Sequence, residues 1–180
     1  MTIRPLPPSF FEQETVHVAQ ALLGHSVVRR GMIFRIVETE AYTQDDPACH
    51  GFKGNKGRGA TIYKSPGLAY VYLIYGMYHC LNVVTEPEGR AGAVLIRALE
   101  PLSGESLKTH GPGRLCKALG ITKLEHNELV LTQANSELFL AEGEPVPDSH
   151  IVTTARIGIS KAQEYPWRFY IRDNPWVSVL

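Results

Sequence analysis

The alternation of apolar and polar residues along the chain predicts a protein built mainly from short strands. Residues 32–42, MIFRIVETEAY, alternate over most of their length, which is typical of a strand with one buried face. Shorter stretches rich in apolar and β-branched residues lie between turn residues and indicate further strands. The other expected strands are residues 25–30, 68–75, 78–84, 92–100, 129–131, 137–141, 150–159 and 168–172.

Helical spacing of apolar residues occurs in two places. Residues 9–23 carry apolar side chains four apart, with Ser9 as a possible N-cap and Gly24 placed to end the helix in the left-handed conformation. Residues 111–120 predict a second, shorter helix, because a proline lies near its start and Gly120 stands past its end.

These elements predict an α+β fold with a single domain over residues 1–180. We expect a curved antiparallel β-sheet flanked by a few helices, with a protruding β-hairpin at residues 68–84. Strands follow one another without intervening helices, so alternating βαβ units are not expected. Residues 43–66 have no clear period, and a loop of that length in a compact domain is more often functional or mobile than incidental.

Composition narrows the class of protein. The 180 residues are 44% hydrophobic, which is ordinary for a globular domain. No apolar run approaches the roughly 20 residues that span a bilayer, and no signal peptide is visible, so we expect no membrane partner and a cytoplasmic location. Cys49, Cys80 and Cys116 form no C-x-x-C motif, which favours reduced thiols. The histidines lack ligand spacing and nucleotide-binding glycine motifs are missing, so neither a metal nor a cofactor is expected.

The charges balance, with 18 basic and 18 acidic residues, which by itself argues weakly against nucleic acid. Their distribution is uneven: residues 51–64 contain Lys53, Lys56 and Arg58 and no acid. Such clustering can make one face basic enough to bind a phosphate backbone, although a solvated loop explains the same residues. The acidic stretch 136–148 favours a solvated loop.

Residues 35–42, RIVETEAY, carry the sharpest chemical signal. Strict alternation would place Glu38, Glu40 and Tyr42 on one face together with Ile36. A solvated face is the ordinary explanation for such a strand. The strand nevertheless runs directly into the basic loop, and catalytic groups are often found on loops.

Two kinds of chemistry fit these carboxylates. Side chains two residues apart on a strand are separated by about 6.6 Å, a spacing found in inverting glycosidases. Such acids should flank the scissile bond from opposite sides, and two side chains next to each other on one strand are poorly placed for that. The simpler hypothesis is that one carboxylate, Glu40, activates one water. Arg97 interrupts an apolar strand and needs a partner, either Glu40 or solvent at the strand end. His50, in the loop, is by itself more often structural than catalytic.

Residues 70–82, YVYLIYGMYHCLN, place four tyrosines around a turn at Gly76. By alternation Tyr72 could line a pocket while Tyr75 projects from the tip. Aromatic rings beside basic residues are typical of proteins that stack on bases or wedge into a duplex. By spacing alone, a hairpin packed in a core explains the same residues.

Five ordered segments resemble those of one enzyme family, the alkyladenine (3-methyladenine, methylpurine) DNA glycosylases. The resemblance runs from about residue 9 to the C-terminus. The segments are RIVETEAY (35–42), YVYLIYGMYHCLN (70–82), LIRALEP (95–101), GPGRLCKALGI (111–121) and RFYIRDNPWVSV (168–179). The resemblance implies a single mixed α/β domain that flips a damaged purine out of duplex DNA and hydrolyses its N-glycosidic bond in base excision repair.

The resemblance also implies catalytic roles. Glu40 matches the general base that activates water. Arg97, together with a backbone carbonyl near Ile159, matches the group that holds the attacking water. No lysine nucleophile stands out, so we expect a monofunctional enzyme that forms no Schiff base and does not cleave the strand.

Four residues match the family's base pocket. Tyr42 and His50 match residues on one side of the extruded base, and Tyr72 matches the ring on the other side. A sandwich of tyrosine rings favours cationic bases through the aromatic quadrupole. Asn82 matches the residue that discriminates against guanine.

Further residues match the surface that meets the DNA. The expected intercalating residues are Tyr75, Met77 and Tyr78, and the expected backbone contacts are Lys53, Lys56 and Arg58. The family loop usually reads T-P-R-N where this chain has KGRG at 56–59, so only the arginine is kept.

The expected partner is double-stranded DNA with damaged purines, and the protein is expected to be a monomer. The residues do not rank 3-methyladenine, 7-methylguanine, hypoxanthine and ethenoadenine as substrates. Two other functions remain open from the residues alone. One is a non-catalytic damage-binding module with the same pocket, and the other is a carbohydrate hydrolase that uses Glu38 and Glu40.

Overall fold

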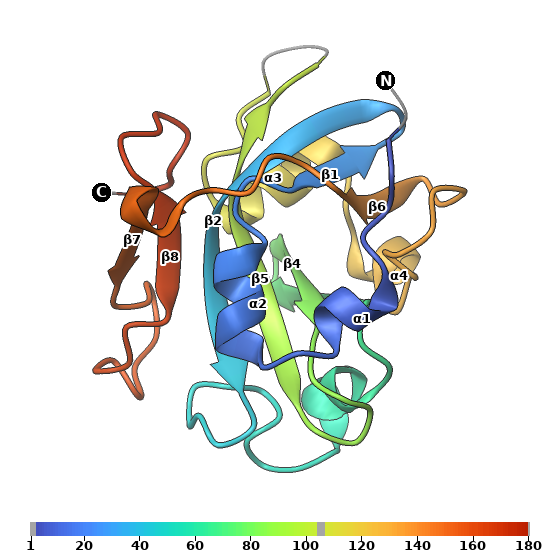
Figure 1. The fold of residues 1–180 in the computed structure, drawn as a ribbon. Coiled ribbons are helices and arrows are strands. Elements are labelled where there is room, and N and C mark those ends of the chain that lie inside the picture. The colour runs from blue at the N-terminus through green and yellow to red at the C-terminus, as the bar shows by residue number, and fades with distance from the viewer. Residues whose placement is uncertain (1–2, 104–106, 180) are drawn as a thin grey trace.

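A curled antiparallel sheet forms the body of the molecule and confirms the α+β class (Figure 1). The structure is a computed structural model that describes residues 3–103 and 107–179. In these residues the sheet has eight strands: β3-β4-β5-β2-β1-β6 in order, with β8 between β2 and β7. The strand bounds are β1 Ser26–Arg29, β2 Met32–Thr43, β3 Ala69–Ile74, β4 Tyr78–Val84, β5 Gly92–Pro101, β6 Leu138–Ala141, β7 Ile151–Thr154 and β8 Arg168–Ile171. The helices are α1 Pro8–Phe11, α2 Thr15–Ala21, α3 Pro112–Leu119 and α4 Lys123–His126, with 3-10 turns η1 Gly57–Tyr63 and η2 Asp148–His150.

The long strand β2 organises this sheet. One of its edges pairs with β5, whereas the other pairs first with β1 and then, at residues 38–40, with β8. Helix α2 lies over β2 and β5, as Figure 1 shows. The Thr39 hydroxyl donates to the Ala19 carbonyl at 2.7 Å, so Thr39 points toward this helix. Since side chains alternate along a strand, Glu40 points to the opposite face.

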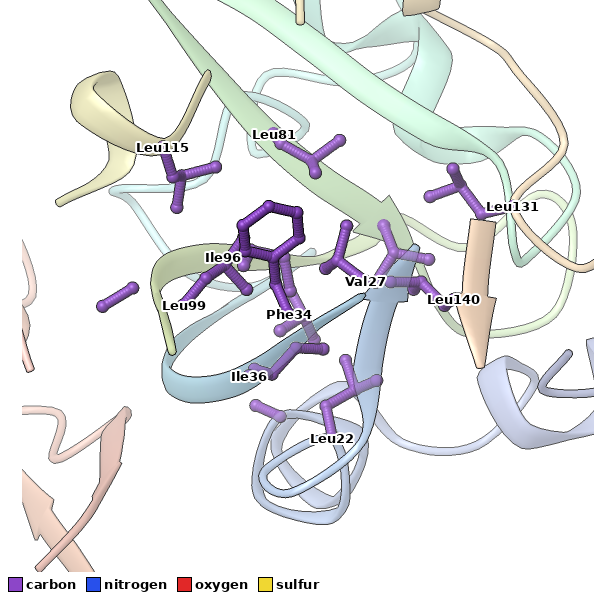
Figure 2. Packing of buried hydrophobic residues seen from close by; sticks show 14 of the residues in the cluster. Leu22, Val27, Phe34, Ile36, Leu81, Ile96, Leu99, Leu115, Leu131 and Leu140 are labelled. Carbon is purple, nitrogen blue, oxygen red and sulfur yellow. The ribbon is translucent and has the colours of Figure 1, made fainter. Parts of the chain in front are cut away.

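One large hydrophobic core lies inside the curl of the sheet (Figure 2). Phe34 of β2, Leu81 of β4, Ile96 of β5 and Leu115 of α3 meet there, each at most 1% exposed. Leu22, which ends α2, closes the core from the helix side. Burial of each such side chain stabilises the fold by about 1.5–3 kcal/mol, which makes a firm support for the strands that carry polar residues.

The strict alternation predicted along residues 35–42 is wrong at Ile36. Ile36 packs in the main core together with Val37. The reason is an irregularity in the pairing of β2 with β5, whose register shifts on both sides of Glu38. Glu38 and Glu40 are both fully buried, so the alternative of a solvated face is excluded.

The single helix predicted for residues 9–23 is wrong, because α1 and α2 are separate. The Glu14 carboxylate accepts hydrogen bonds from the backbone N–H groups of Val16 and His17 and so begins a new helix there. Ser9 is not a cap, since α1 begins after Pro7. Gly24 has the expected positive φ, +88°, and α3 ends as predicted with Gly120 in the left-handed conformation.

Two predicted strands differ from the structure. Residues 129–131 form only one isolated bridge, between Val130 and Leu68. The strand predicted over 150–159 ends at Thr154, because the following residues leave the sheet and turn toward the polar face of β2. The short helix α4 was not predicted, since four residues are too few to show a period.

Candidate active site

A cavity of about 480 Å³ lies on the face of the sheet that carries Glu40. Strands β2, β3, β4 and β5 supply much of its lining, together with the loop that follows β2 and residues 157–161. Most of the predicted site residues meet here: Glu40, Tyr42, His50, Arg58, Tyr72, Tyr75, Asn82 and Arg97. The structure therefore brings together side chains that lie up to 57 positions apart in the sequence, from Glu40 to Arg97.

Glu40 lies at this cavity with no exposed surface of its own. One carboxylate oxygen accepts a hydrogen bond from the Tyr42 hydroxyl at 2.8 Å, and the other accepts one from the backbone N–H of Ile157 at 2.7 Å. The Arg97 guanidinium stands 3.4 Å from the carboxylate, so the predicted pairing of these two residues is confirmed. A carboxylate fixed by such donors is oriented for chemistry on a ligand in the cavity.

Glu38, two residues away, serves a different purpose. It accepts hydrogen bonds from Arg97 Nε at 3.0 Å and from Arg168 Nε at 2.7 Å, and from both the backbone N–H and the hydroxyl of Ser178. Burial alone would raise the pKa of Glu38, but the Ser178 hydrogen bonds and the two arginines outweigh it and lower that pKa. Glu38 is thus an anchor that joins Arg97 to β8 and the C-terminal segment.

Aromatic rings form the sides of the cavity. Burial, and then the neighbouring Glu40 carboxylate, raises the pKa of Tyr42, so this hydroxyl stays protonated and donates. The His50 ring lies edge-on to Tyr72, with centroids 4.7 Å apart, and its Nδ1 is hydrogen-bonded to the Tyr70 hydroxyl at 2.8 Å. A flat base between stacked rings needs about 7 Å between them. The space for a base therefore lies beside the His50–Tyr72 contact and not within it.

Asn82 stands on β4 at the cavity wall and is 3% exposed. Its side-chain N–H₂ group donates to the Tyr70 carbonyl across the hairpin at 3.0 Å. This bond fixes the orientation of the amide, so the residue both joins the strands and presents a rigid edge to the cavity.

The tip of the β3–β4 hairpin is an exposed aromatic. Tyr75 is 81% exposed and adopts a positive φ of 53°, which is uncommon for a bulky residue, followed by Gly76 at 67°. Met77 is 65% exposed, whereas the Tyr78 ring packs on Gly113 of α3, where a Cβ would approach within 3.1 Å. Met77 and Tyr78 line a second hollow of about 380 Å³ between the hairpin and α3.

Of the three predicted basic contacts, the structure places Arg58 at the cavity. Lys53, Lys56 and Arg58 are all exposed, and Arg58 belongs to the cavity lining. The guanidinium carbon of Arg58 lies 5.7 Å from the centroid of the Tyr72 ring. Lys53 and Lys56 contribute to neither of the two hollows.

Several residues at the site were not predicted from the sequence. One is Ile157, whose backbone N–H donates to Glu40; the Ile159 carbonyl, near which the water-holding group stays a prediction, accepts a hydrogen bond from the Gln163 side chain at 2.8 Å. Arg156 forms a buried pair with Asp46, from the loop after β2. The signal in the sequence for this pair was Arg156 itself, an arginine inside the strand predicted over 150–159. Nothing in the sequence links Arg156 to Asp46, which lies 110 positions earlier.

In residues 3–103 and 107–179 we find no group of three or more His, Cys, Asp or Glu side chains that could hold a metal ion. In the same described part of the chain, no helix is long and apolar enough to cross a membrane. The cysteines predicted to be reduced are free and buried: Cys49, Cys80 and Cys116.

A buried, oriented carboxylate at the wall of an aromatic cavity is the arrangement typical of an enzyme pocket. Comparison with known proteins gives the family. The methylpurine-DNA glycosylase family matches residues 9–175. A protein of Salinibacter ruber is 44% identical over 98% of this chain and 97% of its own length. One of Legionella pneumophila is 46% identical over 98% of this chain and 99% of its own length. Both carry the provisional name 3-methyladenine DNA glycosylase.

The chain belongs to the methylpurine-DNA glycosylase family. The resemblance stated from the five segments is thereby confirmed. The family consists of DNA-repair enzymes that remove alkylated purines by hydrolysis of N-glycosyl bonds, and their substrate is DNA.

Proposed function

We propose that this protein is a monofunctional glycosylase that acts as a monomer on double-stranded DNA in a bacterial cytoplasm. It flips an alkylated or deaminated purine into the cavity and hydrolyses the N-glycosidic bond. The proposed substrates are 3-methyladenine and 7-methylguanine, together with hypoxanthine and ethenoadenine. The observation that carries the proposal is the position of Glu40, fully buried and held by hydrogen bonds at the wall of an aromatic cavity.

Glu40 is the proposed general base. It takes a proton from a water as the water oxygen forms a bond to the sugar C1′, while the bond from C1′ to the purine nitrogen breaks and its electron pair leaves with the base. Its negative charge also stabilises the positive charge that develops on the sugar. Arg97, 3.4 Å from Glu40, is well placed to hold that water.

The base is held and selected by the rings and by Asn82. Tyr42 and Tyr72 supply faces on which a flat purine can stack, and His50 lies beside them. Asn82 presents its fixed amide to the cavity, where it opposes the 2-amino group of guanine. A polar group left unpaired in such a pocket is strongly disfavoured.

The hairpin is the proposed wedge. Tyr75 enters the duplex and occupies the space of the flipped base, with Met77 and Tyr78 beside it. Lys53, Lys56 and Arg58 contact the phosphate backbone near the cavity mouth. The exposure of Tyr75 supports this role, because a ring at 81% exposure stabilises no core.

Two other functions fit less well. A pure damage-binding module has no need of a carboxylate close to a phosphate-rich ligand. A carbohydrate hydrolase would need Glu38 as a second acid, but Glu38 is saturated by Arg97, Arg168 and Ser178.

The proposal is tested with duplexes that each carry one damaged base, followed by alkaline cleavage of the abasic sites formed. We expect excision of at least the alkylated purines, and no excision by Glu40→Gln, whose amide cannot accept a proton from water. Glu40→Gln should still bind the damaged duplexes, which shows that the variant is folded. Excision by this variant within a few-fold of the wild type would assign the base to another residue.

A further inference from the structure

A buried ion pair lies directly behind Tyr42. Arg156 contacts both carboxylate oxygens of Asp46, with an Nη2–Oδ1 distance of 3.0 Å, and neither side chain has any exposed surface. Arg156 also donates to the Ala41 carbonyl of β2 at 2.9 Å. These bonds hold the guanidinium in one position against the strand that carries Glu40.

The guanidinium stacks on a ring that the flipped base is proposed to contact. Its central carbon is 4.6 Å from the Tyr42 ring centroid and 5.3 Å from that of Trp167. Tyr42 lines the cavity, but Arg156 does not. The guanidinium therefore stacks on Tyr42 from outside the cavity lining, which leaves the cavity side of the ring for the proposed base.

A cation on one face of a ring weakens the attraction of the other face for a second cation. The attraction comes from the negative potential above the ring, and the guanidinium draws ring electrons toward itself. Its charge also repels a second positive charge across the ring, and burial makes that repulsion stronger than it would be in water. Asp46 offsets only part of this charge. A neutral base is not affected in this way, because its stacking depends on dispersion and contact area.

We propose that Arg156, balanced by Asp46, limits the preference of the Tyr42 face for cationic bases and thereby widens the range of substrates to neutral lesions. This inference rests on the proposed function. Arg156 acts through Tyr42 and touches no substrate, so it is a positioning residue that determines specificity. Glu40 acts in the opposite direction, because its negative charge accepts a hydrogen bond from the Tyr42 hydroxyl at 2.8 Å.

The test compares kcat/KM for 7-methylguanine, which is cationic, with kcat/KM for hypoxanthine, which is neutral, in otherwise identical duplexes. Asp46→Asn keeps the Arg156 cation but removes its counter-charge, so the ratio of the two values should fall about fivefold. The double variant Asp46→Asn/Arg156→Gln removes both charges, so the ratio should rise about fivefold. The 2-amino group of 7-methylguanine is present throughout, so its contribution cancels between variants.

A fall in the ratio for Asp46→Asn together with a rise for the double variant supports the inference. Any other pair of results, including an unchanged ratio, overturns it. Should the double variant fail to fold, Asp46→Asn decides alone, because only the inference predicts a fall in the ratio. A wild-type protein that excises 7-methylguanine but no hypoxanthine overturns the inference and leaves the proposed function intact, whereas excision of neither base overturns both.

Discussion

At the scale of single residues, the two glutamates of β2 have identical side chains but different roles, because their hydrogen-bond partners differ. Glu38 receives hydrogen bonds from two arginines and Ser178, so it has little capacity left for a ligand. Glu40 is held by one hydroxyl and one backbone N–H, and it lines the cavity. The first arrangement stabilises the fold, and the second orients a reactive group.

Glu38→Gln should therefore lower stability more than Glu40→Gln does. Loss of the Glu38 charge leaves Arg168 buried without that counter-charge and leaves Arg97 with Glu40 alone, which costs about 3 kcal/mol in free energy of unfolding. An amide at position 40 can still accept the Ile157 N–H through its oxygen, and its N–H₂ group can donate to the Tyr42 hydroxyl. Chemical denaturation of both variants provides the measurement, and equal losses would show that Glu38 is not the anchor.

Asn82→Ala tests the proposed discrimination against guanine. Removal of the amide opens space beside the 2-position of the base, so excision of 7-methylguanine relative to hypoxanthine should increase about tenfold. The same change removes the bond to the Tyr70 carbonyl, so thermal melts must show that the hairpin is intact. An unchanged ratio in a well-folded variant would remove Asn82 from the selection of substrates.

At the scale of elements, the two strands of the β3–β4 hairpin are buried in the core at one end, and the turn that joins them is exposed. Val71 and Leu81 pack in the main core, whereas Tyr75 and Met77 are exposed beyond it. Positive φ values at Tyr75 and Gly76 set the turn, and for tyrosine that conformation stores strain. A strained and exposed aromatic is better explained by a role in binding than by a role in stability.

Tyr75→Ala should weaken binding to damaged duplex by a few kcal/mol, the cost of the flipped state that the ring stabilises. Its effect on melting temperature should be small, because truncation of an 81% exposed ring leaves no cavity. Tyr75→Phe, which keeps the ring, is the matched control and should bind nearly as the wild type does. A large fall in melting temperature with unchanged affinity would make the hairpin tip a structural element.

At the scale of the whole molecule, several distant segments converge on β2. The C-terminal segment reaches Glu38 through Ser178, and residues 155–157 reach Asp46, Ala41 and Glu40.

Buried titratable groups link the stability of the fold to the pH. His25 is 8% exposed, and its Nδ1 accepts a hydrogen bond from the Gly143 N–H at 3.0 Å, which only the neutral ring can do.

Stability should fall on acidification in two stages. Burial lowers the pKa of His25 in the folded protein, so the unfolded chain binds a proton first and stability is lost as the pH falls below about 6.5. The lowered pKa of Glu38 gives a contribution that is present above about pH 4.3 and is lost as the pH falls through the folded value.

Urea midpoints measured from pH 8 to about pH 2 test both stages. His25→Asn, whose amide oxygen can accept the Gly143 bond without titrating, should reduce the decline between pH 7 and pH 5.5 and leave the part due to His50, whose pKa burial and Arg58 also lower. A decline of the same size in this variant would assign the first stage to another group.

Much of the fold was determined by local sequence. Alternation predicted β2 and the hairpin, and a glycine in the left-handed conformation predicted the end of α3 at Gly120, whereas α2 ends at Ala21, before Gly24. Such signals suffice because strand pleating and positive φ depend on neighbouring residues alone. The sequence also indicated Glu40, Arg97 and Tyr75 as candidate functional residues, and the resemblance of five segments identified the family.

Only the tertiary structure decided how these residues are used. Alternation could not separate Glu38 from Glu40, because their difference lies in partners contributed by β5, β8 and the C-terminal segment. Nor could spacing reveal the Asp46–Arg156 pair, whose members are 110 positions apart. Burial in a low-dielectric interior makes such distant charge pairs decisive, and the chain must fold before they exist.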